Sequence, residues 1–171
     1  MLVHEPDCIA VVETWTNSKI MNSELSIKGY DIIARKDGED TSDGRGRGID
    51  VYAKSGINSF QTEEPTSFSQ AVEFKIAQKK CAVIYRSPNI GDQDSVLQNY
   101  LRTSGPFDLI LGDFNLPIID WKTQTSSTQT GETYVELFQD LFLHQHVEEP
   151  THERGNVLDL VFTQDESFIC T

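Results

Sequence analysis

Short apolar or alternating runs recur along the chain and predict a protein built mainly of β-strands. Each run has the length of a strand and is enriched in Val, Ile, Phe or Tyr. AVEFKIA at 71–77 alternates between apolar and polar residues, and the polar turn that follows it predicts a hairpin with the next run. The predicted strands are Cys8–Val12, Gly29–Arg35, Gly48–Ala53, Ala71–Ala77, Lys80–Tyr85, Phe107–Leu111 and Val157–Phe162.

Two segments instead have apolar residues at helical spacing. In the first, Asp92 is a plausible N-cap before the apolar face. In the second, Thr133 and Glu136 have the spacing of a capping box, and core packing explains an aromatic stripe. The predicted helices are Asp92–Thr103 and Gly131–Leu143, with a weaker one around Ser18–Ser26.

Three long polar segments separate these elements: Lys36–Arg47, Gly56–Ser67 and Lys122–Gly131. There is neither an internal repeat nor a composition shift typical of a linker, so we expect residues 1–171 to form a single domain. Mostly antiparallel strands with helices on their outer faces predict an α+β fold, a layered sandwich.

The 27 acidic and 14 basic side chains give a formal charge of −13, which excludes a generic basic nucleic-acid coat. Residues 1–90 carry a net charge of −2 and residues 91–171 one of −11. The basic residues of the first half include Arg35, Lys36, Arg45, Arg47 and Lys54. Acids lie between them, so a solvated mixed-charge loop and a binding patch both remain open.

The three cysteines form no CxxC pair, and their odd number favours a reduced environment without a zinc site. The N-terminal residues lack a basic region of the kind that precedes a signal sequence, and no apolar run approaches the length of a membrane helix. We therefore expect an intracellular protein, nuclear or cytoplasmic, that is neither secreted nor bound to a membrane.

The most informative stretch for chemistry is ILGDFNLP at 110–117. We expect the strand to end at Leu111 and the chain to turn at Gly112, so that Asp113 and Asn115 face one cavity. The carboxylate can accept a proton from water, and the carboxamide can orient that water or donate to a phosphate oxygen. Taken alone, the pattern is also typical of an Asx turn.

Other predicted strand ends also carry polar groups. Glu13 follows the first strand and is a candidate Mg²⁺ ligand, since this ion commonly takes one or two carboxylates. Tyr85 ends another strand, with Asn89 shortly after it. Asp159 lies inside the apolar run NVLDLVFT, where we expect it to be buried and to need a partner, such as a histidine that it orients.

The blocks ETW, GY-DIIARKD, GRGRGIDVYAK, YRSPN, LGDFNLPIIDW and EPTHERGNVLDLVFT occur in this order from about Pro6 to Thr163. Together they resemble the endonuclease/exonuclease/phosphatase superfamily, and most closely the apurinic-type endonuclease domain of non-LTR retrotransposons. The resemblance implies a four-layered α/β sandwich with two mainly antiparallel sheets. It also implies Mg²⁺-dependent hydrolysis of DNA phosphodiester bonds to leave nicks, with Mn²⁺ as an alternative ion.

The same resemblance assigns roles to individual residues. Glu13 matches the metal-binding Glu, whereas Asp113 and Asn115 match the pair that activates water and holds the phosphate. Tyr85 is similar to the tyrosine that contacts the phosphate. Two further matches are Asn89 with a substrate-contacting Asn and Asp159 with the Asp that orients a catalytic His. The family context adds a reverse transcriptase domain in the same polyprotein as an expected partner.

The sequence also departs from the family pattern. An early strand with a metal-associated Asn and a late Ser-Asp-His block are not found, which implies a domain incomplete at both termini and of marginal stability. Asp50 stands where the family strand has an apolar residue. A catalytically inactive remnant or binding module is therefore the alternative to a nuclease that engages DNA weakly and in a salt-sensitive way. A lipid or inositol phosphatase of the same superfamily is a third reading.

Overall fold

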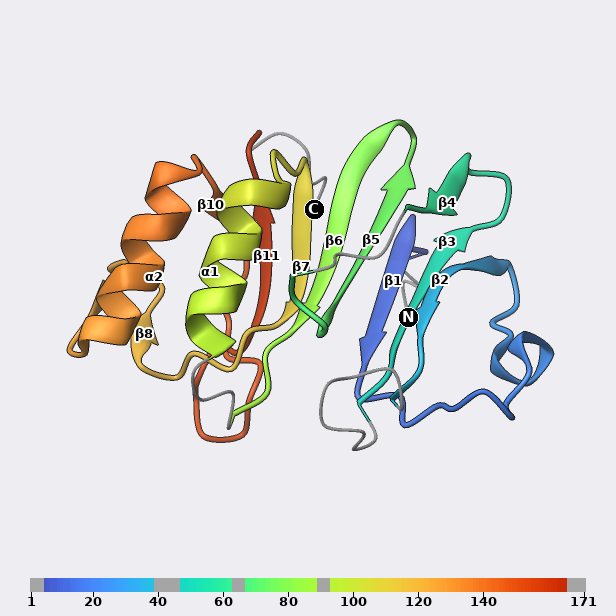
Figure 1. The fold of residues 1–171 in the computed structure, drawn as a ribbon, viewed down its shortest axis with the longest axis horizontal. Coiled ribbons are helices and arrows are strands. Elements are labelled where there is room, and N and C mark those ends of the chain that lie inside the picture. The colour runs from blue at the N-terminus through green and yellow to red at the C-terminus, as the bar shows by residue number, and fades with distance from the viewer. Residues whose placement is uncertain (1–4, 39–46, 63–66, 89–92, 166–171) are drawn as a thin grey trace.

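The computed structural model describes residues 5–38, 47–62, 67–88 and 93–165, and its strands form two main sheets (Figure 1). The smaller sheet has the order β1-β3-β2, with β1 at Cys8–Val12, β2 at Tyr30–Lys36 and β3 at Ile49–Lys54. The larger sheet has the order β10-β11-β7-β6-β5-β4. Its strands are β4 (Ser59–Gln61), β5 (Ala71–Ile76), β6 (Lys79–Tyr85), β7 (Leu109–Asp113), β10 (His144–Gln145) and β11 (Asp159–Thr163).

The sheets pair as the sequence predicts, mostly antiparallel, with β5 and β6 in the expected hairpin. The pair β6–β7 is parallel, because helix α1 (Gln93–Ser104) connects the two strands. A second helix, α2 (Gln129–Asp140), follows a small hairpin of β8 (Ile119–Asp120) and β9 (Thr125–Ser126). The layered α/β sandwich is confirmed.

The alternation of side chains along β6 divides the core into two layers. Ala82 and Ile84 pack toward the helices, in a cluster that includes Leu97, Tyr100 and Phe138. Cys81, Val83 and Tyr85 point the other way and pack against the smaller sheet. Figure 1 shows this order, with both α-helices on one side of the larger sheet and the smaller sheet on the other. Each fully buried large apolar side chain stabilises this arrangement by about 1.5–3 kcal/mol.

The outer face of the smaller sheet carries an irregular segment in place of the weak helix expected at 18–26. Only a short 3₁₀ helix forms there, at Asn22–Leu25. Arg35 holds the segment by donating to the carbonyl oxygens of Asn17 at 2.8 Å and Ile20 at 2.7 Å. Arg35 also forms an ion pair with Asp37. This arginine is therefore engaged inside the fold, which favours the mixed-charge reading of its surroundings over a binding patch.

Several predicted boundaries were wrong, each for a local reason. Strand β7 does not end at Leu111 but continues to Asp113, because neighbouring strands pair with it on both sides. Helix α2 begins at Gln129 and not at Gly131, since the Thr128 side chain accepts the N–H of Gly131 as N-cap. Thr133 therefore lies inside the helix and forms no capping box. The N-cap predicted at Asp92 lies outside the described residues.

The strand β7 can approach β6 closely because residue 112 is a glycine. Gly112 has φ +139°, and a Cβ atom there would lie 1.9 Å from the carbonyl oxygen of Ile84. Both the backbone conformation and the contact therefore require a residue without a side chain. This glycine sets the register that brings the ends of β6 and β7 together.

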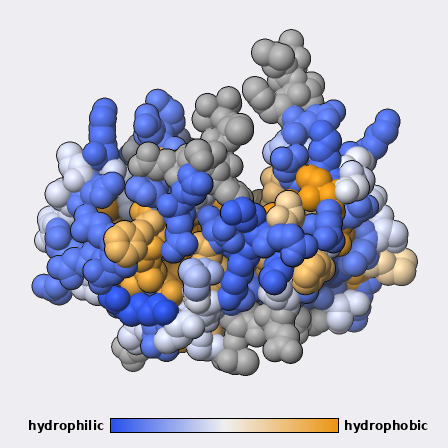
Figure 2. Space-filling model, turned by 90° about the horizontal axis from the view of Figure 1, so that it is seen from above, coloured by the Kyte–Doolittle hydropathy of each residue, from blue (hydrophilic) through white to orange (hydrophobic). Residues whose placement is uncertain are grey.

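The face seen in Figure 2 is mostly hydrophilic, with separate hydrophobic patches. A small cavity of about 300 Å³ is lined by Leu141 and Phe142 among others. Phe142 follows α2 and is 78% exposed. Within the described ranges, no helix has the length and apolar character that crossing a membrane requires.

We expect Gly112→Ala to lower the free energy of unfolding by more than about 3 kcal/mol, because it combines backbone strain with a backbone clash. Gly56→Ala is the matched control: φ is +94° there, but no atom lies within 4 Å of the added Cβ. It should lower stability by only about 1–2 kcal/mol. Urea unfolding followed by circular dichroism measures both, and equal losses would refute the close-approach argument.

Candidate active site

Three of the predicted site residues lie side by side at one end of the larger sheet. Tyr85 ends β6 and is the register partner of Asp113, which ends β7. Asp113 is in turn the register partner of Asp159, the first residue of β11. Residues directly opposite each other in paired strands point to the same face of a sheet. Since Tyr85 faces the smaller sheet, the two carboxylates lie on that inner face as well.

The smaller sheet contributes the fourth group from the facing side. Glu13 follows β1, and its carboxylate accepts a hydrogen bond from the phenol of Tyr85. Burial raises the pKa of the Tyr85 phenol, and the hydrogen bond to Glu13 and the Glu13 charge raise it further. The phenol therefore remains a protonated donor across the physiological range. This hydrogen bond joins the two sheets at the same edge.

Asp113 lies in an electrostatic environment that opposes its ionisation. Burial is the largest cause and raises the pKa of its carboxyl to about 6, with the negative charge of Asp159 second. The charge of Glu13 adds to the increase, whereas the backbone N–H of Asn115 and the Arg86 guanidinium lower it. A carboxyl with a pKa near neutrality is suited to general base catalysis.

The burial predicted for Asp159 was wrong, because this side chain is exposed at the start of β11. The turn before it is fixed by Thr151, whose hydroxyl accepts the N–H of Leu158 at 2.9 Å and that of Asp159 at 3.0 Å. The carbonyl oxygen of Asn156 accepts the N–H groups of Thr151 and His152. Thr151 and Asn156 thus hold the segment 150–161, which includes the sequence blocks PT and NVLDLV, together as one structural unit. The sequence analysis did not predict this role of Thr151.

The Asp113–Asn115 segment forms the predicted Asx turn, and it also carries the two polar side chains predicted for the site. The N–H of Asn115 donates to the Asp113 carboxylate at 2.9 Å, which is the contact of an Asx turn, and Asn115 has φ +48°. Between them, Phe114 is fully buried and packs edge-on against Phe162, with ring centroids 5.4 Å apart. The turn is therefore rigid, and it presents the two polar side chains on either side of a core anchor.

Arg86 holds this turn from within the protein, although nothing in the sequence pattern singled it out. Its backbone N–H donates to the carbonyl of Asp113 at 2.7 Å, and its Nη1 donates to the carbonyl of Asn115 at 2.8 Å. Nε and Nη2 donate to the carboxylate of Asp94 on α1, which also accepts the hydroxyl of Tyr134 on α2. Arg86 thereby links both helices to the Asp113–Asn115 turn.

The chemistry of the donor set fits a divalent cation at this edge. Among the residues that the structure describes, no group of three or more His, Cys, Asp or Glu side chains is placed to hold a metal. A cluster of that size is unnecessary for Mg²⁺, which commonly uses one or two carboxylates and fills its other positions with water and phosphate oxygens. Glu13 is exposed and supplies one such carboxylate. The mutual repulsion of Glu13, Asp113 and Asp159 is what a cation would relieve.

The basic residues of the possible binding patch and Asn89 have different places in the structure. Arg47 lies beside the cluster, with its guanidinium carbon 5.9 Å from the centroid of the Tyr85 ring. It is the basic residue of the mixed-charge segment that the structure brings to the site, whereas Lys54 pairs with Glu5. Asn89 and Arg45 lie outside the described residues.

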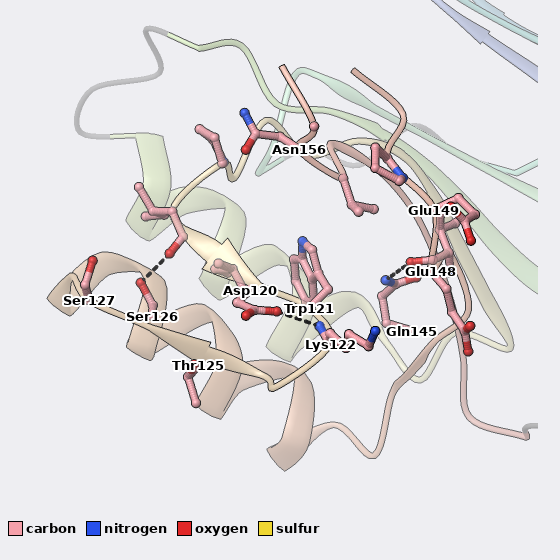
Figure 3. Close-up of a pocket in the computed structure, with 17 residues that line it drawn as sticks. Asp120, Trp121, Lys122, Thr125, Ser126, Ser127, Gln145, Glu148, Glu149 and Asn156 are labelled. Carbon is pink, nitrogen blue, oxygen red and sulfur yellow. Dashed lines mark hydrogen bonds between the residues drawn. The ribbon is translucent and has the colours of Figure 1, made fainter. Parts of the chain in front are cut away.

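A polar pocket of about 760 Å³ lies between the β8–β9 hairpin and the segment before β11 (Figure 3). Its lining includes the carboxylates of Asp120, Glu148 and Glu149 and the single cation of Lys122. Trp121 also lines it, and its Nε1 is buried without a hydrogen-bond partner. The excess of negative charge makes this pocket unsuited to a phosphate group.

Comparison with known proteins gives a family match and a set of similar folds. The family model described as endonuclease-reverse transcriptase matches residues 80–170. No match is found among the curated proteins. Among solved structures, the AP endonuclease LMAP from Leishmania major is 15% identical with a TM-score of 0.60, over 92% of this chain and 69% of that one.

Two further solved structures are similar to the same extent. The 3′ phosphatase NExo from Neisseria, bound to a product DNA hairpin, is 13% identical with a TM-score of 0.61, covering 92% of this chain and 76% of that one. An AP endonuclease from Archaeoglobus fulgidus is 13% identical with a TM-score of 0.61, over 93% and 76% of the two chains. At these identities the likeness shows the fold alone.

We expect Asp113→Asn to stabilise the metal-free protein at neutral pH. The folded pKa of about 6 exceeds the ordinary value of 3.8, so the stability due to the neutral carboxyl is complete below about pH 4 and is lost as the pH rises through about 6. The amide stays neutral and still accepts the Asn115 N–H. After allowance for solvent screening, the gain at neutral pH is about 1 kcal/mol, or about 2–4 °C in Tm.

Thermal unfolding from acid to neutral pH measures this gain, which should vanish below about pH 4. The control is Asp120→Asn, because the N–H of Thr123 lowers the pKa of the Asp120 carboxyl. It should give no stabilisation at neutral pH. A gain from Asp113→Asn that persists in acid would contradict the electrostatic cause.

Arg86→Met is expected to lower the free energy of unfolding by about 3 kcal/mol, because it leaves the Asp94 carboxylate without a cation and the carbonyls of Phe114 and Asn115 without the guanidinium donor. Arg102→Met provides the comparison, since Arg102 forms an exposed ion pair with Asp140 at 3.3 Å. That change should lower it by less than about 1 kcal/mol. Urea unfolding gives both values, and amide hydrogen exchange at Asn115 should rise only in the first variant.

Proposed function

Because this chain belongs to the endonuclease-reverse transcriptase family and has the endonuclease/exonuclease/phosphatase fold, we propose that it is a metal-dependent DNA endonuclease. The proposed reaction is hydrolysis of one phosphodiester bond by water, which leaves a nick. The observation that carries this proposal is the convergence of Glu13, Tyr85, Asp113 and Asp159 at one edge of the two sheets.

In the proposed mechanism, Asp113 accepts the proton of the attacking water, and its raised pKa makes this transfer favourable near neutral pH. The side-chain amide of Asn115 then donates to a non-bridging phosphate oxygen. Tyr85, whose phenol stays protonated, would be the second donor to the phosphate once the Glu13 carboxylate that now accepts its proton binds a metal ion instead. Glu13 is the proposed ligand for Mg²⁺, with Mn²⁺ as a substitute, and the bound ion would offset charge on the phosphate and the leaving oxygen.

Asp159 supports the same site by its charge. It raises the pKa of Asp113 directly, so its effect on the base needs no histidine partner. The orienting of a histidine by Asp159 remains a prediction from the resemblance. Among the described histidines, His146 is hydrogen-bonded to Thr163 at 2.6 Å, at the other end of β11.

The biological setting is part of the proposal. The family description supports an origin in a non-LTR retrotransposon and a reverse transcriptase domain in the same full-length protein. DNA as the partner is supported by the hairpin complex of the Neisseria phosphatase. The net charge of −13 supports weak, salt-sensitive binding in the nucleus or cytoplasm without a membrane contact.

A plasmid-nicking assay with Mg²⁺ tests the activity. We expect conversion of supercoiled to open-circular DNA, at least about 10²-fold slower for Asp113→Asn, since a general base contributes about 10²–10⁴-fold. Asp120→Asn is the matched control outside the cluster and should cut at the parental rate. Chelation of the metal should abolish nicking by the parent.

The second candidate is an inactive binding module with this fold, which is favoured because the imidazoles of His146 and His152 have hydrogen-bond partners other than the Asp159 carboxylate. The two candidates differ in the same assay. Parental nicking no faster than that of Asp113→Asn, together with retained DNA binding, would replace the nuclease proposal by the binding module.

A further inference from the structure

Trp15 is a large aromatic side chain that the fold leaves in solvent beside the proposed site. It is 65% exposed, although it follows Glu13 by only two residues. Among the described residues, no other aromatic ring stacks on the Trp15 indole, and the indole is not part of the buried core. This exposure leaves the flat face of the indole accessible to a ligand.

The loop that carries Trp15 is held firmly on both sides of it. The N–H of Thr14 donates to the carbonyl of Gly48 at 3.2 Å, and the N–H of Gly38 donates to the carbonyl of Thr16 at 3.0 Å. The two threonine hydroxyls are 3.0 Å apart and rest against Gly48, where a Cβ would lie 2.1 Å from Thr14 Oγ1. Thr16 is buried. The indole is therefore presented by an anchored loop.

The backbone of this loop is also in a conformation that ordinary residues avoid. Glu13 has φ +55° and Trp15 has φ +56°, both in the left-handed region. Each such residue costs about 1–2 kcal/mol. The strained backbone directs Glu13 toward Tyr85 and leaves Trp15 on the surface, so one loop positions a site carboxylate and an exposed aromatic ring together.

The surroundings favour a nucleobase over a charged or purely apolar partner. The site edge is rich in carboxylates, which repel a phosphate backbone, and Arg47 beside Tyr85 is the cation that the described structure places there. An aromatic side chain can bind a base through its π-face without any charge, and such stacking contributes about 1–3 kcal/mol per base. An acidic protein that engages DNA gains most from contacts of this kind.

We propose that Trp15 stacks on an unpaired nucleobase of the strand being cut, next to the phosphate held at the Glu13–Tyr85–Asp113 cluster. This assignment rests on the proposed function, because it takes a polynucleotide as the ligand. Trp15 acts in binding and positioning, and it takes no part in proton transfer.

The test uses Asp113→Asn as the background, so that DNA is bound without being cut, in the presence of Mg²⁺. A fluorescein-labelled single-stranded oligonucleotide is titrated and followed by anisotropy, with the same strand in a duplex as the comparison. Adding Trp15→Ala should weaken single-strand binding about 5- to 150-fold, whereas Trp15→Phe should restore most of it. Because stacking releases no counterions, the ratio of affinities should be the same at low and raised salt.

Phe142→Ala is the matched control, since Phe142 is also exposed and has φ +54° but follows α2 on the helix side. It should leave the affinity unchanged. Tryptophan fluorescence gives a second readout with unlabelled oligonucleotide: quenching by the oligonucleotide should be seen with Trp15 present and be lost in both Trp15→Ala and Trp15→Phe.

Equal affinities with and without Trp15→Ala would overturn this inference and leave the nuclease proposal intact, provided that the parent nicks plasmid. Absence of both DNA binding and nicking in the parent would overturn both. A change of oligomeric state in Trp15→Ala, seen by sedimentation without a change in DNA affinity, would assign the indole to a protein contact instead and also overturn the inference.

Discussion

The arrangement of the site depends on the buried guanidinium of Arg86. It is bound on one side by the carboxylate of Asp94 and on the other by the carbonyl of Asn115. A charged group is stable at such depth only when its donors are satisfied, so the guanidinium fixes the positions of everything that satisfies it. The groups it fixes come from the end of β6, the turn after β7 and helix α1, and Tyr134 adds α2 through Asp94. Packing of the helices on the sheet is thereby coupled to the geometry of the Asp113–Asn115 turn.

The carboxylates of Glu13, Asp113 and Asp159, on the other side of that turn, destabilise the folded protein when all three are ionised. Burial, and after it the charges of Asp159 and Glu13, make ionisation of the Asp113 carboxyl unfavourable and raise its pKa. A protein without function would lose nothing by replacing one of them with an amide. Retaining all three is understandable if a cation and a phosphate group enter the site, because the same repulsion then becomes affinity for the metal. Without a ligand these carboxylates lower the stability of the fold, whereas in the proposed complex with a cation they would favour binding, as is common at functional sites.

Much of the fold followed from the period-2 pattern, because the strands of the larger sheet face a different apolar layer on each side. The short strands β4, β8, β9 and β10 were missed, since two or three residues carry no pattern. Glu13, Tyr85, Asp113 and Asp159 could be selected as strand-end polar groups, and the sheet registers then brought them together. Arg86 and Thr151 could not, because their importance lies in backbone groups distant in sequence, which no local pattern reveals. The prediction that Asp159 is buried was wrong for a related reason. An apolar run predicts a strand, but it does not show at which residue that strand leaves the core.

The charge distribution makes a uniform electrostatic mode of DNA binding untenable for this chain. Of the basic residues in the first half, Arg35 and Lys54 are engaged in ion pairs with acids of the chain itself, and Arg47 lies over Tyr85. In the proposed complex with DNA, binding energy would then come from few contacts: a metal ion at Glu13, the cation of Arg47 and an uncharged aromatic surface. Trp15 meets the last requirement from the same anchored loop as Glu13. A nuclease built in this way would gain little affinity from intact duplex and more from DNA in which a base is already unpaired, so local strand opening would select where it cuts.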